Sequence, residues 1–207
     1  MFFGRSISAM LIGAVTILIS ITVHELAHGY AAYRLGDQTA KIQGRLTLNP
    51  LAHLDPIGAL LMFITGFGWA KPVPVNPFFF KGDRTKGMML VSIAGPLANL
   101  VLAWILICVY MGAILVTSTV YPILHTLALL NIYLAVFNLI PIPPLDGSKI
   151  LAGFLPKQIA LKYLTTVEQY GFLILMLLVI VGLVPKVVAP LAAGIYNLML
   201  VPFYFFI

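Results

Sequence analysis

The chain has 207 residues, of which 61% are hydrophobic and only 9% are charged. A soluble domain typically has about 25% charged residues, so this composition excludes a soluble globular protein and indicates an integral membrane protein. The formal net charge is +6 and there is one cysteine. No basic stripe alternates with aromatic residues, so we expect no nucleic-acid partner, and a single cysteine excludes both an internal disulfide and a cysteine-cluster metal site.

Four long stretches without Asp, Glu, Lys or Arg predict the membrane-spanning helices. The first, Ser6–Val23, continues in a helical pattern beyond its end and has no signal-peptide cleavage site, so we interpret it as a retained helix. The 59-residue run Gly87–Leu145 suffices for two crossings with a turn near Gly112–Pro122. Gln169–Pro185 and Val187–Ile207 each approach the roughly 20 residues that a spanning helix needs. The expected fold is an all-α polytopic membrane protein with about five transmembrane helices.

The segment between the first two apolar runs has a different character. Ala40–Leu48 partly alternates polar and apolar residues, and Trp69–Asn76 contains prolines that are incompatible with a central strand. Both predict short edge β-strands on the cytoplasmic side, which could hold an extended peptide by strand addition. Between them, Ile57–Gly68 is apolar for only 12 residues, which favours a re-entrant or interfacial element over a crossing.

The distribution of Lys and Arg sets the expected orientation. If Ile57–Gly68 does not cross, ten of the twelve basic residues lie on one side, and only Arg5 and Lys186 lie on the other. Cytoplasmic segments carry the excess of Lys and Arg. The predicted topology therefore has five crossings, the N-terminus outside and the C-terminus inside.

Candidate catalytic residues begin at His24-Glu25-Leu26-Ala27-His28, near the end of the first apolar helix. Two histidines four residues apart lie on one helix face, where both imidazoles can bind one metal ion, and the adjacent glutamate can act as a general base. Ionisable groups inside a membrane helix are costly and usually functional. The alternative is a buried cluster that only makes hydrogen bonds to neighbouring helices.

A catalytic zinc site normally has three protein ligands. The candidates for the third ligand are His53, His125 and the acidic residues, and Asp146 is favoured among them. It follows a proline-rich stretch that breaks the helix, and irregular backbone at membrane depth is tolerated where it lines a cavity. The predicted five-crossing topology also returns Asp146 to the side of His24 and His28.

These residues resemble the site-2 proteases, a family of intramembrane zinc metallopeptidases. HELAH (His24–His28), GPLAN (Gly95–Asn99) and NLIPIPPLDG (Asn138–Gly147) match three family motifs in order. NPLAHLDPIG (Asn49–Gly58) and GWAKPVPVN (Gly68–Asn76) are similar to the compact prokaryotic subgroup, which implies a prokaryotic cell membrane. The resemblance covers about Ile7–Lys149, and no PDZ domain is visible.

The resemblance implies one Zn²⁺ per chain, held by His24, His28 and Asp146, with Glu25 as the general base. Asn138 and Asn99 are candidates to contact the substrate or stabilise the oxyanion, and the alternative for both is helix–helix hydrogen bonding. His53 could orient a ligand or contact substrate, although we interpret it chiefly as a surface histidine.

The expected function is hydrolysis of peptide bonds within or near transmembrane segments of other membrane proteins, for regulated proteolysis or for clearance of signal-peptide remnants. The expected partners are a transmembrane substrate and the lipid bilayer, with the active site toward the cytoplasm. We expect a single peptidase domain over residues 1–207, with a catalytic core at about 6–149 and a C-terminal helix pair at about 166–207. The alternatives are a zinc transporter or sensor and a catalytically silent site-2-like binder of membrane helices.

Overall fold

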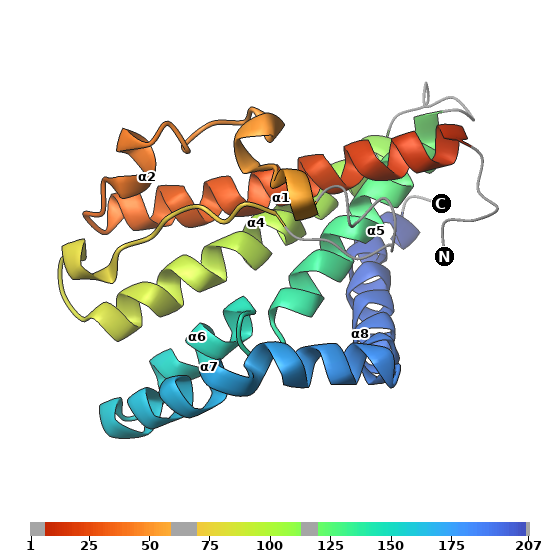
Figure 1. Ribbon diagram of the computed structural model, residues 1–207. Coiled ribbons are helices and arrows are strands. Elements are labelled where there is room, and N and C mark those ends of the chain that lie inside the picture. Colours follow the sequence, from red (N-terminus) through yellow and green to blue (C-terminus); the bar gives the residue numbers. More distant parts are fainter. Residues whose placement is uncertain (1–6, 59–69, 113–119, 206–207) are drawn as a thin grey trace.

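The computed structural model describes residues 7–58, 70–112 and 120–205, and within them the chain is helical (Figure 1). Five helices are long and apolar enough to cross a membrane. These are α1 (Ile7–Arg34), α4 (Arg84–Gly112), α5 (Val120–Asn138), α7 (Lys157–Ile180) and α8 (Leu183–Leu200). The shorter elements are α2 (Thr39–Ile42), η1 (Pro50–His53), η2 (Pro77–Phe79), α6 (Asp146–Phe154) and η3 (Val201–Phe205). The prediction of an all-α polytopic fold is confirmed.

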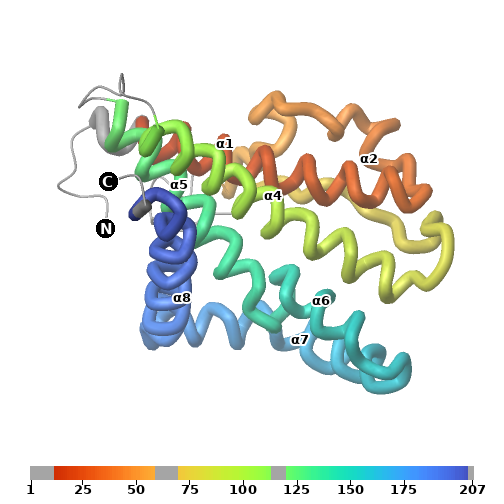
Figure 2. Tube along the Cα trace, turned by 180° about the vertical axis from the view of Figure 1, so that it is seen from behind, coloured from red at the N-terminus to blue at the C-terminus, as the bar shows by residue number. Residues whose placement is uncertain are grey.

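Helix α4 occupies the centre of the helix packing, with α1 and α5 against it (Figures 1 and 2). Small residues let the helices approach closely: Ala103 of α4 and Ala128 of α5 have no exposed surface, and Ala192 of α8 is 1% exposed. Such residues are typical of helix interfaces in membranes, where association depends on close packing. The α1–α4–α5 arrangement brings together three segments that are distant in the sequence.

The proline-rich stretch after α5 separates two helices. Helix α5 ends at Asn138, and α6 begins at Asp146, after the bends and turns of residues 139–145. Gly147 is required there, because a Cβ atom at this position would lie 2.2 Å from the carbonyl oxygen of Leu139 and 2.4 Å from that of Ile140. The result is a sharp chain reversal that places Asp146 at the start of α6.

The edge strand predicted for Ala40–Leu48 is wrong. Asp37 Oδ1 accepts hydrogen bonds from the backbone N–H and the hydroxyl of Thr39, and the short helix α2 follows. A hydrogen bond from an aspartate to the backbone two residues on forms a turn that competes directly with an extended conformation. The segment then passes through a turn at Gly44, whose φ of +66° glycine adopts without strain.

The second predicted edge strand, Trp69–Asn76, is also not a strand in its described part, residues 70–76. Three of its backbone N–H groups are already used: Lys71 N–H donates to His53 O, Val73 N–H to Glu25 and Asn76 N–H to Asp37. The two prolines have no N–H. At most the N–H groups of Ala70 and Val75 remain for strand addition of a substrate along this segment.

The predicted re-entrant segment Ile57–Gly68 falls mostly on residues 59–69, which lie outside the described residues. The segments on either side meet at one end of the helix packing. Lys81 N–H donates to Leu35 O at 2.8 Å, and Lys157 Nζ lies 3.5 Å from Asp83 Oδ2. Backbone N–H groups of Lys86 and Thr85 hold the pKa of the Asp83 carboxyl below its usual value. The residues just before α4 therefore lie beside the end of α1, and the start of α7 lies beside the start of α4.

Candidate metal centre

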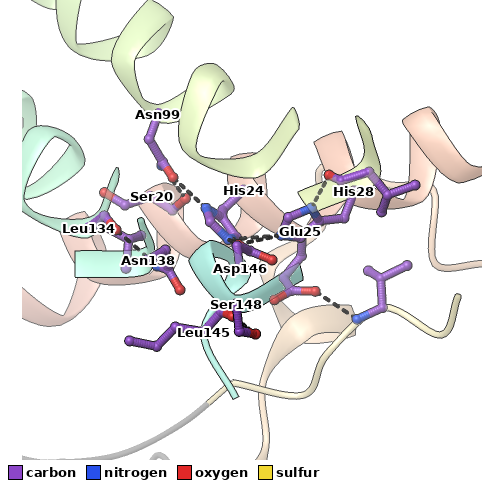
Figure 3. A network of polar contacts seen from close by, with 12 residues as sticks. Ser20, His24, Glu25, His28, Asn99, Leu134, Asn138, Leu145, Asp146 and Ser148 are labelled. Carbon is purple, nitrogen blue, oxygen red and sulfur yellow. Dashed lines mark hydrogen bonds and ion pairs between the residues drawn. The ribbon is translucent and has the colours of Figure 1, made fainter. Parts of the chain in front are cut away.

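Three donor atoms from α1 and α6 converge at one point (Figure 3). His24 Nε2 and His28 Nε2 are 2.9 Å apart, and each lies 3.1 Å from Asp146 Oδ2. All three side chains are buried, with exposed fractions of 6%, 9% and 7%. Helical spacing supplies the two imidazoles from one face of α1, and the turn after α5 supplies the carboxylate.

Hydrogen bonds on the far side of each ring assign the histidine tautomers. His28 Nδ1 lies 2.7 Å from Val91 O, which can only accept, so Nδ1 donates. His24 Nδ1 lies 2.6 Å from Asn99 Oδ1, and the Nδ2 of that amide already donates to Ser20 O and Asn131 Oδ1. His24 Nδ1 is therefore also the donor. In the neutral rings, both Nε2 atoms then present lone pairs toward the carboxylate.

This donor set fits a zinc ion. Two imidazole lone pairs and a carboxylate oxygen face one another without a hydrogen atom between them, an arrangement that a shared cation stabilises. Zn–N and Zn–O bonds of about 2.0–2.1 Å in a tetrahedral site separate the ligand atoms by roughly 3.3 Å, close to the observed 2.9–3.1 Å. Hydrogen bonding of the second ring nitrogen to a carbonyl group is also typical of metal-binding histidines.

Glu25 lies beside the donor atoms and is held by the backbone of the extended segment 70–76. Its Oε2 accepts the N–H of Val73 at 2.7 Å (Figure 3). Among the described residues, Oε1 has no hydrogen-bond partner. One carboxylate oxygen is thus anchored, and the other is available to exchange a proton.

A cavity of about 260 Å³ lies next to the donor atoms. Its wall includes His24, Glu25, His28 and Asp146, apolar residues of the segment 70–76 and of α4, and three further polar side chains, Ser92, Asn138 and Lys149. Asn138 donates one amide hydrogen to Leu134 O at 2.9 Å. Its second amide hydrogen remains for another partner.

Asn99 supports His24 and does not line this cavity. It has no exposed surface, and its amide joins a buried network with Ser20 of α1 and Asn131 of α5. Both of its amide donors are used within the protein, so the structure favours the helix-packing interpretation of Asn99. Sequence reasoning missed Asn131, although an asparagine in the middle of the apolar run of α5 was the available signal.

His53 is not a surface residue, and that interpretation is wrong. Only 2% of it is exposed, and its Nε2 lies 2.9 Å from Thr47 O. Its Nδ1 has no partner among the described residues. His53 is not among the residues that line the metal cavity, and the element that carries it, η1, packs on α1. The compact packing of η1 on α1 could not be inferred from the sequence.

Gly95 permits the close approach of α4 to the imidazoles. A Cβ atom there would lie 2.5 Å from His28 Nε2 and 2.7 Å from His24 Cε1. We expect Gly95→Ala to weaken zinc binding by about 10- to 100-fold, the range found when the support of a metal ligand is lost. Alanine favours the helix over glycine by about 1 kcal/mol, so weakened helix formation cannot explain such a loss.

The measurement is zinc content per folded chain after dialysis against graded chelator concentrations. Gly194→Ala in α8 is the matched control, because a Cβ atom there meets no other atom within 4 Å. Normal zinc retention by Gly95→Ala would show that the imidazoles are not held against α4 as described.

Comparison with known proteins finds one matching family and several similar proteins. The family described as "Peptidase family M50" matches residues 12–117 and 110–180. "Putative zinc metalloprotease YwhC" of Bacillus subtilis (strain 168) is 46% identical over 185 residues, covering 86% of this chain and 84% of that protein. "Putative zinc metalloprotease Rip2" of Mycolicibacterium smegmatis is 33% identical over 176 residues, and the match spans 64% of its length. No solved structure matches this chain with significance.

Proposed function

The chain belongs to peptidase family M50, the site-2 protease family of zinc metalloproteases, and on that basis we propose that it hydrolyses peptide bonds within or near transmembrane segments of other membrane proteins. The observation that supports the proposal most strongly is the geometry of the metal cavity. Two imidazoles in the metal-binding tautomer and a carboxylate converge there, and the anchored Glu25 carboxylate lies on the same wall.

In this proposal His24, His28 and Asp146 hold one zinc ion, which supplies Lewis acidity: it lowers the pKa of water toward about 7 and polarises a carbonyl group. Glu25 Oε1 accepts the proton of the attacking water and later delivers it to the leaving amine. The Val73 N–H on Oε2 keeps the carboxylate in place between these two transfers. Asn99 positions His24 by accepting its Nδ1 hydrogen.

Asn138 is the proposed oxyanion contact. It lines the cavity, and one amide hydrogen is left after its bond to Leu134 O. A preorganised donor directed at developing negative charge stabilises the transition state more than the ground state. All residues assigned to the cavity lie between 24 and 149, within the proposed catalytic core of residues 6–149.

Two alternatives involve no hydrolysis. A zinc transporter or sensor would need metal-binding groups along a path across the bilayer, but the metal-ligating cluster among the described residues is a single group in the C-terminal half of α1 and at the start of α6. A protein that only binds membrane helices does not require a proton acceptor, such as the Glu25 carboxylate, beside a metal site. Cleavage of a detergent-solubilised transmembrane substrate by purified protein, lost with chelator and restored by zinc, distinguishes the peptidase from both. Zinc-independent cleavage or no cleavage would contradict the proposal.

We also propose that the metal cavity faces the cytoplasm. Lys41, Lys81 and Lys157 should lie on the cytoplasmic side and Lys186 on the outside, because Lys and Arg are enriched in cytoplasmic segments. The Lys81–Leu35 and Lys157–Asp83 contacts support a common side for the first group. Single-cysteine labelling in intact and opened cells, in a Cys108→Ser background, tests this orientation. Labelling of positions 41 and 81 from opposite sides would contradict it.

A further inference from the structure

Ser92 of α4 has a buried hydroxyl group without a hydrogen-bond partner. The residue has no exposed surface, and its Oγ is one of the few buried side-chain atoms in the described part of the chain that lack a partner. It lines the same cavity as His24, His28 and Asp146. A buried hydroxyl that stays unpaired destabilises a protein, so each such group in a native structure needs an explanation.

The buried hydroxyl groups of α1 behave differently. Thr16, Ser20 and Thr22 of α1 each donate to a backbone carbonyl three or four residues earlier, at 2.7–2.9 Å. This back-bonding is the usual way in which a helix satisfies Ser and Thr. Ser92 makes no such bond, although it also lies within a helix. Its hydroxyl therefore has no partner within the described part of the protein.

Ser92 lies on α4 between two residues that contact the metal-binding histidines. It follows Val91, whose carbonyl orients His28, and it precedes by three residues Gly95, which lies against both imidazoles. Much of the remaining cavity wall is apolar. An extended peptide carries a polar amide at each residue, and a buried amide needs a partner.

We propose that Ser92 Oγ hydrogen-bonds a backbone amide group of the bound peptide and thereby binds the substrate beside the metal centre. This inference rests on the proposed peptidase function. It adds a substrate-binding residue on α4 to the groups supplied by α1, α5 and α6. Because Ser92 has no partner within the protein, its replacement should affect peptide binding without lowering stability.

The test uses Ser92→Ala in two backgrounds. In otherwise wild-type protein, KM for a detergent-solubilised peptide with an apolar span of about 20 residues should rise, while kcat changes little. In a Glu25→Gln background, which prevents turnover, direct binding of the same fluorescein-labelled peptide should weaken by about 2- to 10-fold, the value of one hydrogen bond. Zinc content should stay unchanged, and the thermal midpoint should be equal or higher.

Thr16→Val is the matched control, because it removes a buried hydroxyl that is already paired within α1. It should lower the thermal midpoint slightly and leave peptide binding unchanged. Unchanged peptide binding by Ser92→Ala, in a protein whose wild-type form cleaves the peptide, would overturn the inference. A loss of zinc or of thermal stability in Ser92→Ala would also overturn it, because the hydroxyl would then have a structural role. Absence of cleavage by the wild-type protein would instead contradict the proposed function.

Discussion

Glu25→Gln should retain zinc but lose nearly all peptidase activity. Glutamine keeps the size of the side chain, and its carbonyl oxygen can still accept the Val73 N–H that holds Glu25 Oε2 at 2.7 Å. It cannot accept a proton from water at neutral pH. General acid–base assistance contributes about 10²–10⁴-fold, so the single-turnover cleavage rate should fall by at least that factor. The measurement is cleavage of a transmembrane peptide at matched amounts of folded, zinc-loaded protein.

The chain contains one other glutamate, Glu168, which provides the matched control. Glu168 is exposed on α7 and is not among the residues that line the metal cavity. Glu168→Gln makes the same chemical change and should leave the cleavage rate within about twofold of wild type. Wild-type activity in Glu25→Gln would exclude Glu25 as the general base.

Asp146→Ala should lose zinc as well as activity. The substitution removes the only carboxylate among the three converging donors and leaves two imidazoles. Loss of a residue that merely supports a ligand weakens metal binding by about 10- to 100-fold, so loss of a ligand itself should weaken it by more than about 100-fold. Metal analysis after dialysis, together with the cleavage assay, measures both effects.

Asp146 also begins α6, and a carboxylate in the first turn of a helix contributes about 0.3–1 kcal/mol to stability. A purely structural Asp146 would therefore give the opposite pattern, with full zinc occupancy and a lowered thermal midpoint. Asp83→Ala is the control for this case, because Asp83 is an exposed carboxylate with a structural role: it precedes α4 and accepts the N–H groups of Thr85 and Lys86. It should lower the thermal midpoint and keep zinc.

The parts of the site that the sequence predicted are those set by local chemistry. The four-residue spacing of His24 and His28 places both rings on one helix face whatever surrounds them. The prolines before Asp146 predicted a break in the helix, and α5 ends at Asn138, before the first of them. The apolar runs predicted the five candidate spanning helices, because their length and composition are themselves the physical requirement for crossing a bilayer.

The features that the sequence did not predict depend on contacts between distant segments. Asn131 meets Asn99 across α4 and α5, and Val73 reaches Glu25 over 48 residues of chain. The alternating pattern of Ala40–Leu48 was misleading because Asp37 Oδ1 binds the N–H and the hydroxyl of Thr39 and fixes a turn that leads into a short helix. His53 carries no sequence signal of burial, since its environment arises only when η1 packs on α1.

The most direct test of the central claim is the position of the cut. A membrane protein with a single apolar span of about 20 residues is reconstituted in vesicles with the purified chain, and the fragments are identified by mass spectrometry. We expect zinc-dependent cleavage at a peptide bond within or immediately beside the apolar span, and none with Glu25→Gln. Cleavage confined to soluble regions far from the span, or cleavage that persists with Glu25→Gln, would contradict the proposal that this chain is an intramembrane peptidase.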